Sequence, residues 1–204
     1  MSTTTSRPLI AALQVTLDGY AIGAEGDSVD SWADALELLP PVDAFVLGGG
    51  MFPGYEWFWG AVLDDPSAVS AMLGRDPFPR EVDYARFAAK TPHLVLSTTL
   101  QEATWPSARI VRDVSEVAAL KQQPGDAIYA VGGPGLVESL IDAGLVDELR
   151  LILHPVSAGA GKGDATVGKL PHCQGLELVA AEPVAAGRVY LTYRIDASTP
   201  QSTE

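Results

Sequence analysis

The chain of 204 residues is long enough for one domain with a substantial core, and 47% hydrophobic and 19% charged residues indicate a globular protein. Its formal net charge of −13 opposes binding to nucleic acid or to an anionic membrane, because their phosphates would be repelled. The single cysteine, Cys173, cannot form an internal disulfide, and no apolar run resembles a signal peptide or membrane span, so we expect a cytoplasmic protein.

The first part of the chain alternates buried strands with a helical segment. Leu9–Leu17 and Val42–Leu47 are almost wholly apolar, which is typical of central strands that are covered on both faces. Between them, a helix can begin at Asp30 or Ser31 and must end before Pro40. This part of the chain therefore predicts a strand, a helix and a second strand.

The segment Met51–Pro79 is rich in aromatic residues and is interrupted by proline and glycine. Within it, only Val62–Leu73 is predicted to be a short helix. Long inserts in compact domains are typical of lids over binding sites or of interfaces. We therefore expect an aromatic lid or a dimerisation arm, with a packed surface loop as the alternative.

The rest of the chain returns to alternating strands and helices and ends in a hairpin. The expected elements are a helix over Arg80–Ala89, strands at His93–Ser97 and Ala108–Val111, a helix after Asp113, a strand at Ala127–Val131, a helix from Pro134 to Gly144, a strand at Val146–Val156, and hairpin strands at Leu176–Ala181 and Arg188–Ile195. In the last strand, polar and apolar residues alternate, which predicts one face in contact with water.

Strands joined by helices run parallel, with helices on both faces of the sheet. We therefore predict a single three-layer α/β domain over residues 8–195, built on a mixed, mostly parallel sheet with a C-terminal antiparallel hairpin. Residues 1–7 and 196–204 are expected to be flexible termini.

Four predicted strands end in small or hydrogen-bonding residues. These ends are Asp18-Gly19, Gly48-Gly49-Gly50, Ser97-Thr98-Thr99 and Gly132-Gly133-Pro134-Gly135. Ligands of such sheets bind beyond the carboxyl ends of the strands. The last turn also leads into a helix, whose first N–H groups and dipole can hold a phosphate. A tight connection without a ligand is the alternative for that turn taken alone.

Several runs of residues, taken in this order, resemble a known family. They are Thr16-Leu-Asp-Gly-Tyr20, Val42-Asp-Ala-Phe-Val-Leu-Gly48, Leu94-Val-Leu-Ser-Thr-Thr-Leu100, Ile128-Tyr-Ala-Val-Gly-Gly133, and Gly144-Leu-Val-Asp-Glu-Leu-Arg-Leu151 with His154-Pro155. Residues 8–195 thereby resemble the dihydrofolate reductase-like family and, within it, the reductase domain of the bifunctional riboflavin-biosynthesis deaminase–reductase.

The resemblance implies an NADPH-dependent reductase that acts on a pterin- or pyrimidine-like heterocycle, and it implies a homodimer. The nicotinamide would lie near the first strand, the phosphates at the two glycine turns, and the adenosine at the end of the third strand. The residues implied to bind the cofactor are Ala12, Ile22, Gly48, Gly49, Gly50, Ser97, Thr98, Thr99, Gly132, Gly133, Pro134, Gly135 and Leu136.

Two positions depart from the pattern of this family. Many relatives carry arginines at the turn after the second strand and at the end of the third strand, where this chain has Gly49 and Thr98. An arginine–phosphate contact is stronger than a neutral hydrogen bond. Three alternatives therefore stay open. Backbone amides and Lys162 compensate for the missing arginines, the protein prefers NADH or a flavin-like ligand, or it binds no dinucleotide. The alternative function is a non-catalytic nucleotide- or flavin-binding protein.

The proton source for a reduction is not obvious in the sequence. Asp34, on the helix beside the first strand, is the candidate catalytic residue, and a carboxylate that stabilises the helix dipole is its alternative. Asp18 is predicted to be a turn residue and His154 a structural histidine. No cluster of His, Cys and Asp has the spacing of metal ligands, so we expect no metal site.

Overall fold

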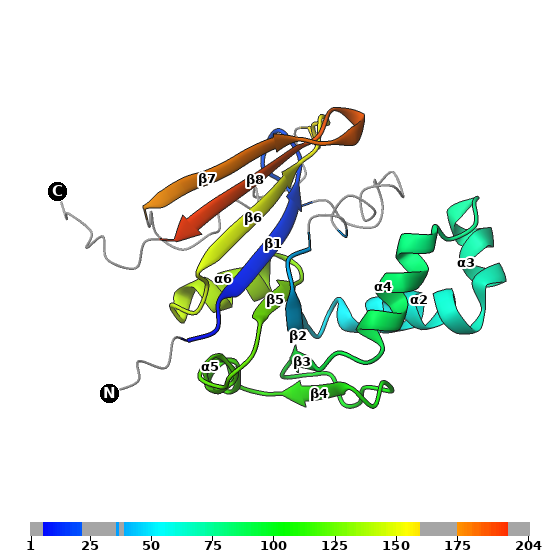
Figure 1. The fold of residues 1–204 in the computed structure, drawn as a ribbon, viewed down its shortest axis with the longest axis horizontal. Coiled ribbons are helices and arrows are strands. Elements are labelled where there is room, and N and C mark those ends of the chain that lie inside the picture. The colour runs from blue at the N-terminus through cyan, green and yellow to red at the C-terminus, as the bar shows by residue number, and fades with distance from the viewer. Residues whose placement is uncertain (1–5, 22–35, 37–38, 160–174, 196–204) are drawn as a thin grey trace.

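The computed structural model describes residues 6–21, 36, 39–159 and 175–195 (Figure 1). Their strands form one sheet in the order β4-β3-β2-β5-β1-β6-β8-β7. The strands are β1 (Leu9–Val15), β2 (Val42–Gly48), β3 (His93–Leu96), β4 (Ala108–Val111), β5 (Ala127–Val131), β6 (Glu148–Leu153), β7 (Leu176–Pro183) and β8 (Val189–Ile195). The helices are α2 (Phe52–Asp64), α3 (Pro66–Leu73), α4 (Pro79–Ala88), α5 (Ser115–Lys121) and α6 (Pro134–Asp142).

The sheet is parallel from β4 to β6, and its last two strand pairs are antiparallel. This arrangement confirms the predicted mixed sheet with a C-terminal hairpin. Figure 1 shows α2, α3 and α4 gathered beside β2 and β3, with β7 and β8 at the opposite edge.

Two hydrophobic cores lie on opposite faces of the sheet. Because successive side chains of a strand point to opposite faces, β1 contributes to both cores. Leu9, Ala11 and Leu13 pack on the side of α5 and α6, whereas Ile10 packs on the side of α2, α3 and α4. The protein therefore has the predicted three layers, with helices on each face.

The structure corrects the expectation that Met51–Pro79 contains only one short helix, whereas a role of this segment as a lid or a dimerisation arm stays a prediction. Most of this segment forms α2 and α3, and α2 buries Phe52, Tyr55 and Trp59 in the core under the helical layer. These side chains recur at helical spacing, and Pro53 and Pro66 stand in the first turns of their helices, where proline is tolerated. The segment is part of the connection between β2 and β3.

Two further expectations are corrected by the structure. Arg7, expected in a flexible terminus, is buried, and its Nε donates to the carbonyl oxygen of Asp126 at 2.7 Å. The face of β8 expected to meet water is also buried over most of its length, because Tyr190 and Thr192 are only 4% and 8% exposed, and only Arg194 near its end is exposed. The alternation along β8 is therefore real, but its polar face is an interior one.

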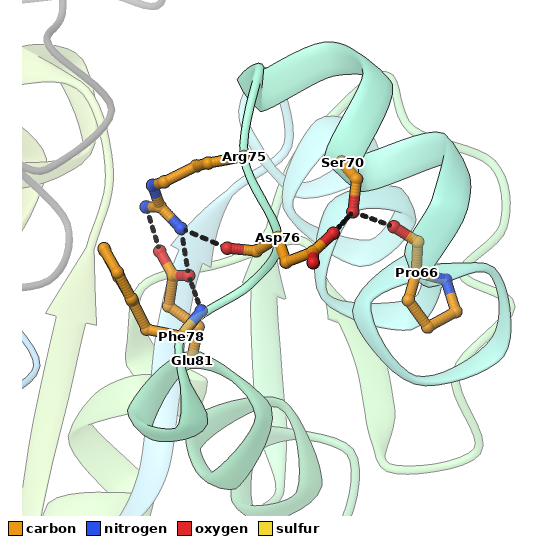
Figure 2. A network of polar contacts seen from close by, with 6 residues as sticks. All are labelled: Pro66, Ser70, Arg75, Asp76, Phe78 and Glu81. Carbon is orange, nitrogen blue, oxygen red and sulfur yellow. Dashed lines mark hydrogen bonds and ion pairs between the residues drawn. The ribbon is translucent and has the colours of Figure 1, made fainter.

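A buried carboxylate fixes the turn between α3 and α4 (Figure 2). Glu81 is 1% exposed, and its two oxygens accept hydrogen bonds from Arg75 at 2.8 and 2.9 Å. One of these oxygens also accepts from the main-chain N–H of Phe78 at 2.7 Å. Burial alone would raise the pKa of Glu81, but the hydrogen bonds and charge of Arg75 outweigh burial and lower that pKa from its ordinary value.

A cluster of three polar side chains lies inside the core under α2 and α4. The Tyr55 hydroxyl is 2.7 Å from the Tyr84 hydroxyl and 3.3 Å from His93 Nε2. His93 Nδ1 is 2.7 Å from the carbonyl oxygen of Thr91, so Nδ1 carries the hydrogen of the neutral ring and Nε2 accepts. Burial lowers the pKa of His93 to about 4, although the hydrogen bond to Thr91 opposes that shift.

We expect Glu81→Gln to lower the free energy of unfolding by about 2 kcal/mol, because Arg75 then loses its opposite charge in a mostly buried setting. Asp83→Asn is the matched control, since Asp83 pairs with Arg86 on the exposed side of the same helix. That substitution should lower the free energy of unfolding by less than about 0.5 kcal/mol. Urea unfolding of both variants checks this, and equal losses would contradict a dominant role for the buried pair.

We expect His93 to make the protein less stable as the pH falls from 6.5 to about 4. In that window the unfolded chain binds a proton on this histidine and the folded chain does not, so the free energy of unfolding decreases by up to about 3 kcal/mol. The phenyl ring in His93→Phe cannot bind a proton, so this variant should lack that part of the pH dependence of stability. Urea unfolding across this window compares the two proteins, and identical pH dependence would exclude His93 as the cause.

Candidate functional site

The carboxyl ends of the central strands meet at one edge of the sheet. Leu47 near the end of β2 pairs with Val131 at the end of β5, and Gly48 pairs with Leu96 at the end of β3. The N–H of Gly49 donates to the carbonyl oxygen of Leu96 at 3.0 Å. The glycine turn after β2 therefore lies between the ends of β3 and β5.

Close packing explains two of the glycines at this edge. An ideal Cβ on Gly49 would lie 2.2 Å from Ser97 Oγ, and one on Gly132 would lie 2.7 Å from Leu136 Cδ2. A Cβ on Gly132 would also approach the main-chain nitrogen of Gly48 to 3.5 Å. The structure thus brings these five residues together from three strand ends and the start of α6.

The N-terminus of α6 opens onto this edge. Gly133 precedes the helix, and no side chain of the described residues caps it. Gly133 and Gly135 are exposed, and an ideal Cβ on either would meet no atom of the described residues within 4 Å. N–H groups in the first turn of a helix, together with the helix dipole, favour anions. Leu136 differs from its neighbours, because its side chain belongs to the core and its N–H donates to the carbonyl oxygen of Gly133 at 3.1 Å.

The turn after β3 is held by Ser97. Its Oγ accepts hydrogen bonds from the N–H groups of Thr99 at 3.3 Å and Leu100 at 3.0 Å, and Thr98 and Thr99 are exposed. Arg112, which directly follows β4, donates from Nη1 to the carbonyl oxygen of Ser97 at 2.6 Å. The exposed Arg112 was absent from the predicted site, although its place directly after a strand was the signal that could have found it.

Ala12 lies on β1 between Val131 of β5 and Arg150 of β6. On the same face, Gln14 Oε1 is 2.8 Å from His154 Nε2, and His154 is 6% exposed. A buried, hydrogen-bonded imidazole agrees with the structural role predicted for this histidine. The other two predicted residues near the first strand, Ile22 and Asp34, lie outside the described residues.

Asp18 connects the loop after β1 to the loop after β6. Its carboxylate accepts hydrogen bonds from the Thr16 hydroxyl at 2.6 Å, the Ser157 hydroxyl at 2.8 Å, and the N–H groups of Ala158 and Gly159 at 3.0 Å each. These bonds, that of Thr16 foremost, lower the pKa of Asp18 well below its ordinary value. Asp18 therefore ties two chain segments together, beyond the local turn role expected for it.

In the part of the chain that the structure describes, no group of three or more His, Cys, Asp and Glu side chains is placed to hold a metal ion. The helices of that part are all too short or too polar to cross a membrane. Lys162, the predicted helper at the phosphates, lies outside the described ranges.

The sheet order, the two antiparallel strand pairs at its end and the helices on both faces define a dihydrofolate reductase-like α/β fold. Dihydrofolate reductase from Enterococcus faecalis complexed with NADP(H) shares the fold with a TM-score of 0.58 and 18% identity, over 93% of this chain and 96% of that one. Diaminohydroxyphosphoribosylaminopyrimidine deaminase/5-amino-6-(5-phosphoribosylamino)uracil reductase from Thermotoga maritima aligns with a TM-score of 0.56 and 15% identity, over 95% of this chain and 58% of that longer one.

Residues 7–190 match the family described as RibD C-terminal domain, and the chain belongs to this family. A curated relative, the uncharacterized protein YyaP of Bacillus subtilis (strain 168), is 30% identical over 165 residues, which are 76% of this chain and 79% of the relative. Family and fold confirm the resemblance drawn from the sequence, and they support a reductase-like function.

Proposed function

We propose that the protein is a nicotinamide-dependent reductase of a pyrimidine- or pterin-like heterocycle. The observation that carries the proposal is the meeting of the glycine turns after β2 and β5 at the open N-terminus of α6. Such a surface offers backbone N–H groups to phosphates. The RibD C-terminal domain family and the fold shared with an NADP(H)-complexed dihydrofolate reductase support the same function.

The residues at this edge fit a dinucleotide of this kind. The amides around Gly133 and Gly135 would hold the diphosphate, and the nicotinamide would lie against β1 at Ala12. A reduced nicotinamide held there would supply a hydride for a carbon of the substrate's C=N bond, and the nitrogen of that bond would need a proton. Asp34 stays our candidate for the group that delivers this proton.

Arg112 offers the cationic group that the turns after β2 and β3 lack. Its guanidinium lies at the end of β4, next to Ser97, where the adenosine end of the cofactor is expected. An arginine–phosphate contact is stronger than the neutral hydrogen bonds that the two turns offer. We therefore propose that Arg112 binds the 2′-phosphate, which favours NADPH over NADH.

A non-catalytic nucleotide- or flavin-binding protein is the alternative, favoured by Gly49 and Thr98 at positions where relatives carry arginine. Wild-type protein should be assayed for loss of reduced-nicotinamide absorbance with 5-amino-6-(5-phosphoribosylamino)uracil, the compound in the name of the Thermotoga maritima enzyme, and with dihydrofolate. Turnover of either compound excludes the alternative. Binding of NADPH without any turnover favours it.

We expect Gly133→Asp to separate stability from cofactor binding. The backbone at Gly133 has φ −71° and ψ 173°, so any residue fits there, and Asp is a good N-cap that should add about 0.3 kcal/mol of stability relative to Gly. Its carboxylate would lie beside the cofactor diphosphate and should weaken NADPH binding about ten-fold or more. Gly133→Asn is the uncharged control. Fluorescence titration with NADPH and urea unfolding measure both effects, and equal affinities of the two variants would contradict a phosphate site at α6.

We expect Arg112→Ala to weaken NADPH binding about ten-fold and to leave NADH binding nearly unchanged, because only NADPH carries the 2′-phosphate. Arg109→Ala is the matched control, since it removes an exposed arginine of β4 itself, one that pairs with Glu116. Titrations with both nucleotides check the expectation. If the two variants weaken both nucleotides alike, Arg112 acts only through the general charge of the protein.

A further inference from the structure

The sheet face that carries Ala12 continues across β6 and β8 as a buried polar surface. Arg150 is mostly buried there beside Tyr190 and Thr192. The core under α2, α3 and α4 includes residues of β1, β2, β3 and β5 but none of β6 or β8. Buried polar groups need hydrogen-bond partners. A polar group on this face whose donors or acceptors are not used within the protein is therefore a candidate for ligand recognition.

Most of this polar surface is satisfied internally. Arg150 forms an ion pair with Glu148, and its Nη1 donates to the Tyr190 hydroxyl at 3.3 Å. Burial raises the pKa of Tyr190, which keeps its hydroxyl neutral as the acceptor of that bond. The charge of Arg150 is therefore matched within the cluster, and its role is structural.

Gln14 differs from these residues. An amide oxygen can only accept, so the 2.8 Å contact with Gln14 Oε1 requires that His154 carries a hydrogen on Nε2. This contact fixes which way the amide of Gln14 faces. Among the residues that the structure describes, the two N–H bonds of that amide have no partner. Gln14 therefore presents a donor whose orientation is already set.

The position of Gln14 suits contact with a heterocycle. It follows Ala12 by two residues on the same face of β1, a separation of about 7 Å along the strand. It also lies at the carboxyl end of the sheet, where His154 is held by a main-chain hydrogen bond from its N–H to the carbonyl oxygen of Val15 at 2.8 Å. A side chain held by a fixed partner loses little freedom when it binds a ligand.

We propose that Gln14 is a specificity-determining residue that donates an amide N–H hydrogen bond to a ring carbonyl oxygen of the substrate, with His154 as the positioning residue. The inference rests on the proposed reductase function and narrows its substrate class. A donor at this place favours a pyrimidinone or pteridinone with a carbonyl facing β1. It disfavours an amino group there, because two donors would oppose each other.

Four variants test this inference with NADPH and 5-amino-6-(5-phosphoribosylamino)uracil. Gln14→Leu removes the donor, and Gln14→Glu can still accept from His154 but cannot donate. Both should raise the KM for the uracil compound about ten-fold and change the Kd of NADPH less than about two-fold. His154→Gln keeps an N–H for Gln14 and should raise the KM less than His154→Leu.

A direct measurement separates recognition from mere structural support. The side-chain amide signal of Gln14, identified in nitrogen–proton NMR spectra by its loss in Gln14→Leu, should shift when the uracil compound or dihydrofolate is added to the NADP⁺-saturated protein. If neither compound shifts it, or if Gln14→Leu loses stability without any change in KM, the inference is overturned while the reductase function stands. Failure of the wild type to bind NADPH would instead overturn the proposed function itself.

Discussion

The close approach of the turns after β2 and β3 is the constraint on which the site depends. A Cβ on Gly49 would lie 2.3 Å from Ser97 Cβ, a contact that no side-chain rotation can relieve. Only glycine therefore allows the two strand ends to lie side by side, with Gly49 bound to the carbonyl oxygen of Leu96. Because β5 pairs with β2, the same approach also places the start of α6 beside the turn, where Gly133 stays open to solvent. Packing, and not ligand binding, thus explains part of the glycine pattern.

Much of the fold was predictable, because its signals are local. Almost wholly apolar strands such as Val42–Gly48 and the glycine turn before Pro134 can be recognised from a few residues of sequence. The helix α2 was missed because its one proline and two glycines were taken as interruptions. Proline in the first turn of a helix starts it, and the spacing of Tyr55, Trp59 and Val62 already showed a buried helical face. In this segment the periodicity of the aromatic and apolar residues is a better guide to structure than its content of proline and glycine.

The candidate site was only partly predictable, because several of its contacts join distant parts of the chain. The glycine turns were found from the sequence, since each stands at a strand end. Gln14 and His154 are 140 residues apart, and their hydrogen bond depends on the pairing of β1 with β6. Alternation along β8 could show that its two faces differ, but not which face is covered, so the burial of Tyr190 was missed.

An acidic protein can still hold a phosphate-bearing ligand, because the total charge and the local site act over different distances. At physiological salt, charges farther away than about 8 Å are largely screened. A bound phosphate would therefore respond mainly to its immediate surroundings, the first N–H groups of α6 and the guanidinium of Arg112. The net charge of −13 acts on the approach of an anionic ligand and makes it slower at low salt. The geometry of the site at the sheet edge, and not the sign of the protein's net charge, therefore decides which anion stays bound.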